Sequence, residues 1–143
     1  MKLNLREARS DERELLQRLL GEYLFEFDGR TEPYPYLDLY WHESDRVPFL
    51  IEVDGTTVGL CLIRERNQGW SIAEFWVKPA QRRSGVGSAA VETVATRGRA
   101  AGADYLEAKV HPDNREALPF WLSVGFQEAD SPGTGVTITR RPL

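Results

Sequence analysis

A strand-like run that leads through a basic, glycine-containing loop into an alanine-rich helix constrains this chain more than any other feature. The run is Ser71–Val77, and the loop Gln81–Ser88 carries two arginines and two glycines. The first turn of a helix has backbone N–H groups without an internal partner, and glycine lets an anion approach them closely. Arginine adds positive charge and a fork of donors. This order predicts an α/β chain with a binding site for a phosphorylated ligand.

Two common phosphate-binding motifs do not match this loop. A P-loop ends in Gly-Lys followed by Ser or Thr, and no lysine follows Gly87. A dinucleotide-binding fingerprint needs a third glycine three residues after Gly87, where this chain has Ala90. What remains is Arg82-x-x-Gly85-x-Gly87. On this pattern alone, a plain loop before a surface helix explains the residues equally well.

A second segment, Asn114–Phe126, has the pattern of a helix followed by a strand. Its apolar positions have the i, i+3, i+4, i+7 spacing of one helix face and are Ala117, Phe120, Trp121 and Val124. Gly125 is placed to end the helix as a C′ cap, and Phe126 is placed to begin the next strand. The segment therefore predicts a helix over residues 114–124.

Together the two segments resemble the two signatures of the GNAT N-acetyltransferase superfamily. The loop is similar to the acyl-CoA pyrophosphate pattern Gln/Arg-x-x-Gly-x-Gly/Ala, and the second segment is similar to Asn-x-x-Ala-x-x-Phe-Tyr-x-x-x-Gly-Phe. The resemblance covers residues 71–126. The runs Tyr23–Asp28 and Ala73–Val77 also look like a little-characterised subgroup of predicted bacterial acetyltransferases, a similarity that names no substrate.

The periodicity of the chain predicts the element order β-α-α-β-β-β-α-β-α-β-β within one domain, residues 1–143. Helices are expected over residues 11–28, 36–43, 86–101 and 114–124. Strands are expected over residues 2–8, 47–53, 56–64, 71–77, 105–110, 126–129 and 136–140. The resemblance implies an α/β (α+β) fold with a mixed, mostly antiparallel sheet and helices on both faces. It also implies that residues 71–77 and 105–110 form parallel neighbours that splay apart around CoA.

The resemblance implies acetyl-CoA as cosubstrate and an acyltransferase that transfers the acetyl group to a primary amine by direct attack on the thioester. In the family, backbone groups at Trp76 and Val77 bind the pantetheine arm, and those of residues 83–88 bind the pyrophosphate. Asn114 commonly contacts the cofactor, although a role as a helix N-cap explains it equally well. The expected cofactor-binding residues are Trp76, Val77, Arg82, Arg83, Ser84, Gly85, Val86, Gly87, Ser88, Asn114, Phe120 and Trp121.

An alkyl amine has a pKa of ~10 and arrives protonated, so acetyl transfer needs a base. Glu74 is the first candidate, because it lies on the strand that lines the acyl site and its apolar neighbours would raise its pKa. A glutamate that forms a salt bridge or faces solvent explains the residue at least as well. His111, at the end of the next strand, is a second candidate, with a plain loop histidine as its alternative.

Trp121 departs from the family signature, which has a tyrosine at this position. An indole N–H donates a hydrogen bond but does not release its proton at neutral pH, so the usual phenolic acid is missing. A thiol pKa near ~8.5 still makes the thiolate a tolerable leaving group. Water or another tyrosine, such as Tyr105, could supply the proton. The departure keeps a second function open, that of a noncatalytic acyl-CoA-binding or sensor module.

The first helices shape the acceptor pocket in the family. In this chain the region is rich in aromatic and acidic side chains, which suit a small cationic amine through cation–π contact and ion pairing. An amphipathic helix followed by a solvated acidic loop explains the same composition. The acceptor-binding residues expected from it are Tyr23, Glu26 and Tyr36.

Composition narrows the expected partners. The net charge of −4 argues against nonspecific nucleic-acid binding, and no window approaches the ~20 apolar residues of a membrane span. The first residues lack the apolar run of a signal peptide, so a cytoplasmic protein is expected. Cys61 is the only cysteine, and His42 and His111 are far apart, so no metal site is expected. The closing strands could pair across a homodimer.

Overall fold

Seven strands form one sheet in the computed structural model, which describes residues 1–143. Their order is β1-β2-β3-β4-β5-β7-β6, and every neighbouring pair is antiparallel except β4 and β5. The α/β class with a mixed, mostly antiparallel sheet is therefore confirmed. The strands are β1 Leu3–Glu7, β2 Arg46–Val53, β3 Thr56–Arg66, β4 Gly69–Val77, β5 Tyr105–Val110, β6 Gln127–Asp130 and β7 Thr137–Pro142.

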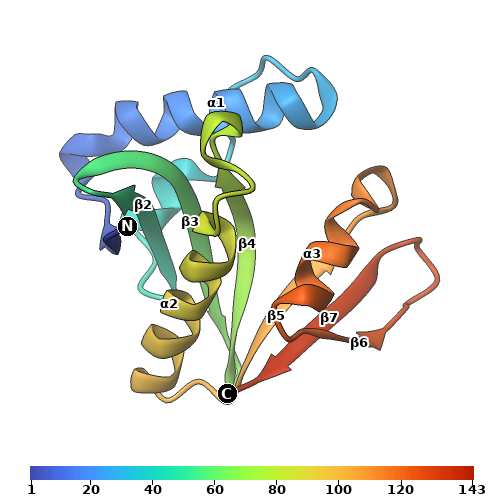
Figure 1. The fold of residues 1–143 in the computed structure, drawn as a ribbon. Helices are drawn as coiled ribbons and strands as arrows, with labels where there is room; N and C mark the ends of the chain where they lie inside the picture. Colours follow the sequence, from blue (N-terminus) through green and yellow to red (C-terminus); the bar gives the residue numbers. More distant parts are fainter.

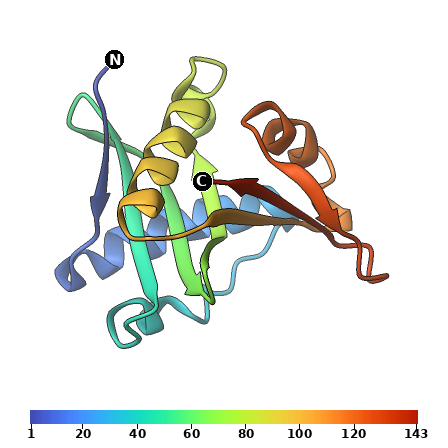
Figure 2. The same ribbon diagram turned by 90° about the horizontal axis from the view of Figure 1, so that it is seen from below.

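Helices cover both faces of this sheet, as predicted. Figures 1 and 2 show α1 on one face and α2 and α3 on the other. Each helix turns one apolar side to the sheet, and the buried residues of α1 recur at helical spacing: Leu16, Leu19, Leu20 and Leu24. The helices are α1 Arg13–Asp28, α2 Val86–Ala100 and α3 Ala117–Ser123.

The second predicted helix, over residues 36–43, is not an α-helix. The structure has a 3-10 helix there, Leu37–Trp41, in which Leu37 and Tyr40 are buried. Side chains three residues apart eclipse one another in a 3-10 helix, so this short, tight form buries both on one side.

The helix predicted over residues 114–124 is also shorter than expected. A 3-10 turn, Pro112–Asn114, comes first, and α3 begins only at Ala117. Pro119 explains the late start, because a residue without an N–H is tolerated only in the first turn of an α-helix.

Gly125 ends α3 as predicted. Its φ is +96°, and its N–H donates to the Leu122 carbonyl at 3.2 Å. The Phe126 N–H donates to the Trp121 carbonyl at 3.1 Å, which completes the bond pair of a Schellman motif. The rings of Trp121 and Phe126 pack edge to face with centroids 5.0 Å apart. The end of the helix thereby holds Trp121 against the sheet.

The parallel strands β4 and β5 pair over only part of their length. Gly69–Ile72 pairs with Tyr105–Ala108, and no pairing continues beyond Ile72 and Ala108. From there the two strands diverge, which Figure 1 shows as a V between β4 and β5. The predicted pair of splayed parallel strands is confirmed. Backbone groups on the open side of each strand have lost their ladder partners.

A β-bulge at Ala73 changes the direction of the side chains that follow it in β4. Leu62 is paired with Glu74 and Ile63 with Ile72, so Ala73 is the extra residue. Ile72 packs in the core on the α2 side, whereas Ala73 packs against the core on the α1 side. Without the bulge, Glu74 would share the face of Ile72. With it, the carboxylate of Glu74 meets α1.

Candidate active site

A cleft of ≈ 800 Å³ runs along the gap between β4 and β5, with walls from α1 on one face of the sheet and from the α2–α3 side on the other. We call these walls the α1 half and the α2–α3 half. The cleft brings together most of the residues that the sequence singles out, although they come from α1, β4, the loop before α2, α2 itself, the 3-10 turn before α3, and α3. Those lining it are Tyr23, Glu26, Glu74, Trp76, Val77, Arg82, Arg83, Gly85, Gly87, Ser88, Asn114, Phe120 and Trp121.

The start of α2 offers unpartnered donors to the α2–α3 half. Gly85 caps the helix with φ +85°, a conformation that favours glycine, and no side chain accepts from the first turn. The first helical bond runs from the Ala89 N–H to the Gly85 carbonyl at 3.0 Å. The N–H groups of residues 86–88 therefore have no protein acceptor. Together with the helix dipole, they favour an anion at this place.

Two residues of the loop turn their side chains away from the cleft. The Ser84 hydroxyl donates to the Gln81 carbonyl at 2.7 Å, and the Val86 side chain is buried in the core. Only the backbone of these two residues is available to a ligand. Arg83 lines the cleft and adopts a left-handed φ of +60°, which is uncommon for a residue with a side chain.

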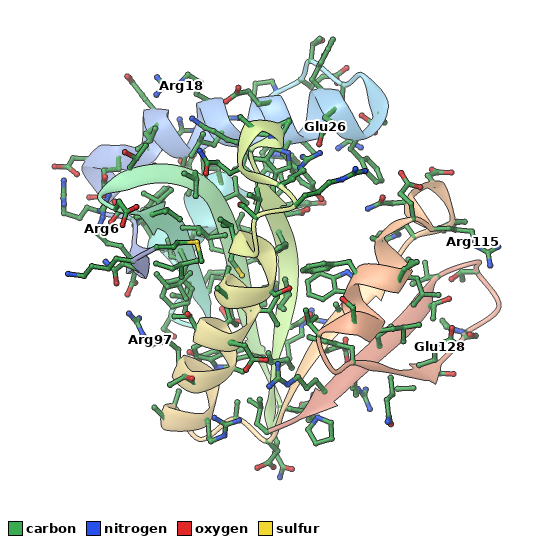
Figure 3. The ribbon with its side chains drawn as sticks, viewed as in Figure 1. Arg6, Arg18, Glu26, Arg97, Arg115 and Glu128 are labelled. Atoms are coloured by element: carbon green, nitrogen blue, oxygen red, sulfur yellow. The ribbon has the colours of Figure 1, made fainter.

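Arg82 is held by protein groups on the rim of the cleft. Its Nε donates to the Val77 carbonyl at 2.9 Å, and a terminal nitrogen pairs with Glu26 Oε1 at 2.5 Å. The Trp76 indole donates to the same Glu26 oxygen at 3.1 Å, and the Arg82 hydrogen bond lowers the pKa of Glu26. Glu26 lies on α1 close to this loop (Figure 3). The Arg82 guanidinium thus links α1 to the loop. It does not point toward the free N–H groups at the start of α2.

The register of β4 decides which backbone groups face the gap. The Lys78 N–H donates to the Val58 carbonyl of β3, so alternation along the strand turns the backbone groups of Trp76 toward β3 as well. Those of Phe75 and Val77 then face the open side, where β5 has diverged. The Val77 carbonyl accepts from Arg82, which leaves the Val77 N–H and both groups of Phe75 free. Phe75, rather than Trp76, therefore offers backbone donors and acceptors to the cleft.

An aromatic cluster forms the floor of the α2–α3 half. Phe75 lies 5.8 Å from Phe120 and 5.4 Å from Trp121 between ring centroids, and Phe120 lies 5.1 Å from Trp121. A Cβ built on Gly87 would lie 3.2 Å from the Phe120 ring, so the first turn of α2 and the side chain from α3 face each other closely. Glycine at this position keeps the space between them open.

Asn114 lines the cleft from the 3-10 turn before α3. Its N–H donates to the His111 carbonyl at 2.9 Å, and the N-cap of α3 is Glu116, without a side-chain cap bond. The alternative of Asn114 as the N-cap of a helix that begins with it is therefore wrong. Asn114 instead contributes to the lining of the cleft.

Glu74 occupies the centre of the α1 half. The hydroxyls of Tyr23 and Tyr34 donate to its two oxygens at 2.9 and 3.1 Å. It forms no ion pair, and its side chain is half-buried with both oxygens hydrogen-bonded to tyrosines, so neither a salt bridge nor a fully solvated side chain explains the residue. Burial raises the pKa of Glu74, and the two tyrosine hydrogen bonds lower it by less. Burial and the charge of Glu74 also raise the pKa of Tyr23 and Tyr34, which keeps both hydroxyls protonated as donors.

Some sequence-based expectations fall outside the cleft. Tyr36 is 54% exposed and packs edge to face on Tyr34, so it does not line the cleft that holds Tyr23 and Glu26. His111 does not line it either. Conversely, the sequence did not mark Tyr34 as a donor to Glu74, because forty residues separate the two and no local pattern links them. Lys109 of β5 also lines the cleft and was not singled out.

A family model described as "Acetyltransferase (GNAT) family" matches residues 13–126 of the chain. The chain belongs to the GNAT acetyltransferase family. Family membership identifies this GNAT chain as an acyltransferase with acetyl-CoA as its cosubstrate, which confirms the resemblance of the two signatures. A comparison with curated proteins gives no match.

Solved structures support the GNAT fold at low sequence identity. An acetyltransferase from Thermus thermophilus has a TM-score of 0.84 and 22% identity, covering 100% of this chain and 98% of that one. A GNAT-family acetyltransferase from Staphylococcus aureus has a TM-score of 0.82 and 18% identity, covering 99% of each chain. A PaiA N-acetyltransferase from Thermoplasma acidophilum, solved in complex with coenzyme A, has a TM-score of 0.77 and 15% identity, covering 100% of each chain.

In the GNAT chain, no group of three or more His, Cys, Asp or Glu side chains is arranged to hold a metal ion. None of its helices has the length and apolar character needed to span a membrane.

Proposed function

We propose that this GNAT chain transfers the acetyl group of acetyl-CoA to a primary amine of a small acceptor. The observation that carries the proposal is the position of Glu74, a shielded carboxylate in the α1 half of a cleft whose other half presents the free donors of α2. An acyl donor held by the α2–α3 half and an amine held by the α1 half would meet in the gap between β4 and β5.

The chemistry that fits this arrangement is direct attack of the amine on the thioester. Cys61, the only thiol, is fully buried outside the cleft, and burial raises its pKa, so it is unsuited to carry an acyl group. We infer that Glu74 accepts the proton of the acceptor ammonium. A raised pKa makes it a better base than an exposed glutamate. Tyr23 and Tyr34 hold its carboxylate in place.

We infer that the backbone binds most of the cofactor. The N–H groups of residues 86–88 fit the diphosphate, and Arg83 adds positive charge. The gap-facing groups of Phe75 and the N–H of Val77 fit the amides of the pantetheine arm and the developing oxyanion. Arg82 supports this site indirectly, through its bonds to Val77 and Glu26.

The Trp121 side chain decides how the thiolate leaves. Trp121 lines the cleft beside Phe75, where the family signature has a phenol, and its indole offers hydrogen bonding without proton transfer. Trp121→Tyr should raise kcat, by up to the ~10²–10⁴-fold that a positioned acid supplies, and leave the Kd of acetyl-CoA nearly unchanged. Trp121→Phe is the matched control, because it has the same ring as tyrosine without the hydroxyl. Equal kcat values for the two variants would show that no acid is needed here.

A noncatalytic acyl-CoA-binding module is the second candidate, and the same Trp121 favours it. An assay of free CoA thiol with acetyl-CoA and a library of primary amines, including amino acids, polyamines, aminoglycosides and peptides, separates the two. An N-acetyltransferase releases one CoA for each acetylated amine formed. Tight binding of acetyl-CoA without CoA release for any amine would support the binding module and reject the proposed activity.

A further inference from the structure

We propose that the acceptor carries an acidic group as well as its amine, and that Lys109 binds this group. The inference rests on the proposed acetyltransferase function and names the class of acceptor within it: amines that bear a carboxylate or a similar anion. It separates this chain from an enzyme for polyamines, although a spermidine N-acetyltransferase chimera is among its structural neighbours at 15% identity and a TM-score of 0.76.

The strand geometry places Lys109 on the acceptor side of the cleft. Leu106, Ala108 and Val110 of β5 all pack in the core on the α2 side. Side chains alternate along a strand, so Lys109 points to the opposite face, the one that α1 covers. Lys109 also comes directly after Ala108, where pairing with β4 ends. It therefore reaches the open part of the gap, on the same face as Glu74, and lines the cleft there.

No carboxylate of the protein neutralises Lys109, which takes part in no ion pair and no side-chain hydrogen bond. Two acids of the cleft and one of β5 have other partners in the protein. Glu74 accepts from two tyrosines, Glu26 pairs with Arg82, and Glu107 on the same strand pairs with Arg140 at 3.0 Å. Glu116 lines the cleft from the start of α3 and forms no ion pair with Lys109.

The cleft thus presents a base for the amine on β4 and, on β5 across the gap, a cation without a protein partner. An acceptor with a second ammonium would bring like charges together at Lys109, which is unfavourable at close range. An acceptor with an anionic end supplies the missing partner and orients its amine toward Glu74. Lys109 is accordingly a residue for acceptor specificity and not a catalytic group.

The test uses three acceptors that share one primary amine: 4-aminobutanoate, 1-aminobutane and 1,4-diaminobutane, with a homologous six-carbon set. At low ionic strength, we expect wild-type kcat/KM to be highest for the acid, by about fivefold over the neutral amine, as for a partly exposed ion pair, and mostly through KM. Lys109→Met should abolish the preference, and Lys109→Glu should reverse it in favour of the diamine.

Arg18→Glu is the matched control, because it changes the net charge equally while Arg18 points away from the cleft on α1 (Figure 3). This control variant should keep the wild-type order of kcat/KM among the three acceptors. The same order of acceptors in wild type and Lys109→Glu would overturn the inference. Absence of turnover with every amine rejects the proposed function instead. In that case, 4-aminobutanoate and its six-carbon homologue are titrated into the CoA-bound protein to test the role of Lys109. Loss of their binding in Lys109→Glu would support the inference, and binding equal to that of the wild type would overturn it.

Discussion

Glu74→Gln should lower kcat/KM for a primary amine by about 10³-fold at pH 7, and the loss should disappear near pH 10. With the base removed, only the free amine can attack, and an amine of pKa ~10 is about 0.1% deprotonated at pH 7. The rate of the variant should therefore rise about tenfold per pH unit up to the pKa of the amine. Initial rates of CoA thiol release between pH 6 and 10 measure how the rate depends on pH in the wild type and in the variant.

The pH–rate profile of the wild type should have an acid limb, a rise of the rate with pH as Glu74 loses its proton, which the profile of Glu74→Gln lacks. Glu74 must be deprotonated to accept a proton, so the rate rises with pH through its pKa, which burial places above the usual value. Tyr34→Phe removes one donor that lowers this pKa, and the acid limb should move to higher pH. Parallel profiles for wild type and Glu74→Gln would show that Glu74 is not the base.

Stability provides an internal control for the same variant. A carboxyl whose pKa is raised by folding stabilises the fold below its unfolded pKa, and this contribution is lost as pH rises through the folded pKa. At pH 7 the glutamine variant should therefore be no less stable than wild type. Glu22→Gln, on the exposed side of α1, should change neither rate nor stability. A lower Tm for Glu74→Gln would point to a structural role for the carboxylate.

Gly87→Leu should weaken acetyl-CoA binding by 10²-fold or more without destabilising the fold. Gly87 lies in the first turn of α2, and a side chain there projects into the cleft toward the Phe120 ring, 3.2 Å from the Cβ position. Loss of two charge-assisted hydrogen bonds to the diphosphate, at ~1.5–3 kcal/mol each, accounts for this magnitude. Leucine has a better helix propensity than glycine by almost ~1 kcal/mol, which offsets the crowding.

Gly21→Leu is the matched control for this effect. Gly21 is also helical, in α1, and nothing lies within 4 Å of a Cβ built on it. Calorimetric titration should show wild-type affinity for acetyl-CoA in this variant. Unchanged affinity in Gly87→Leu would place the diphosphate away from the first turn of α2.

The parts of the site that follow from local sequence could be predicted. The strand, glycine loop and helix form because each is specified by neighbouring residues, and the end of α3 follows from Gly125 alone. Trp121 and Phe120 reach the cleft because they share a helix face, which their spacing already shows.

The parts that depend on distant contacts could not be predicted. The bulge at Ala73 turns Glu74 toward α1, and no residue pattern marks it. Tyr34 reaches Glu74 only after a loop folds back over the sheet. The arginine pattern of the loop suggested an anion ligand for Arg82, but the acid that engages it in the structure is Glu26, on a helix far away in sequence.

The central claim is that one cleft through the sheet holds the acyl donor on its α2–α3 half and the acceptor base on its α1 half. A crystal structure with bound acetyl-CoA tests it most directly. We expect the diphosphate on the N–H groups of residues 86–88, the thioester carbonyl at the Val77 N–H, and the acetyl carbon in the gap on the side of Glu74. A diphosphate bound elsewhere, or an acetyl group separated from Glu74 by the Phe75 and Trp121 rings, would contradict it.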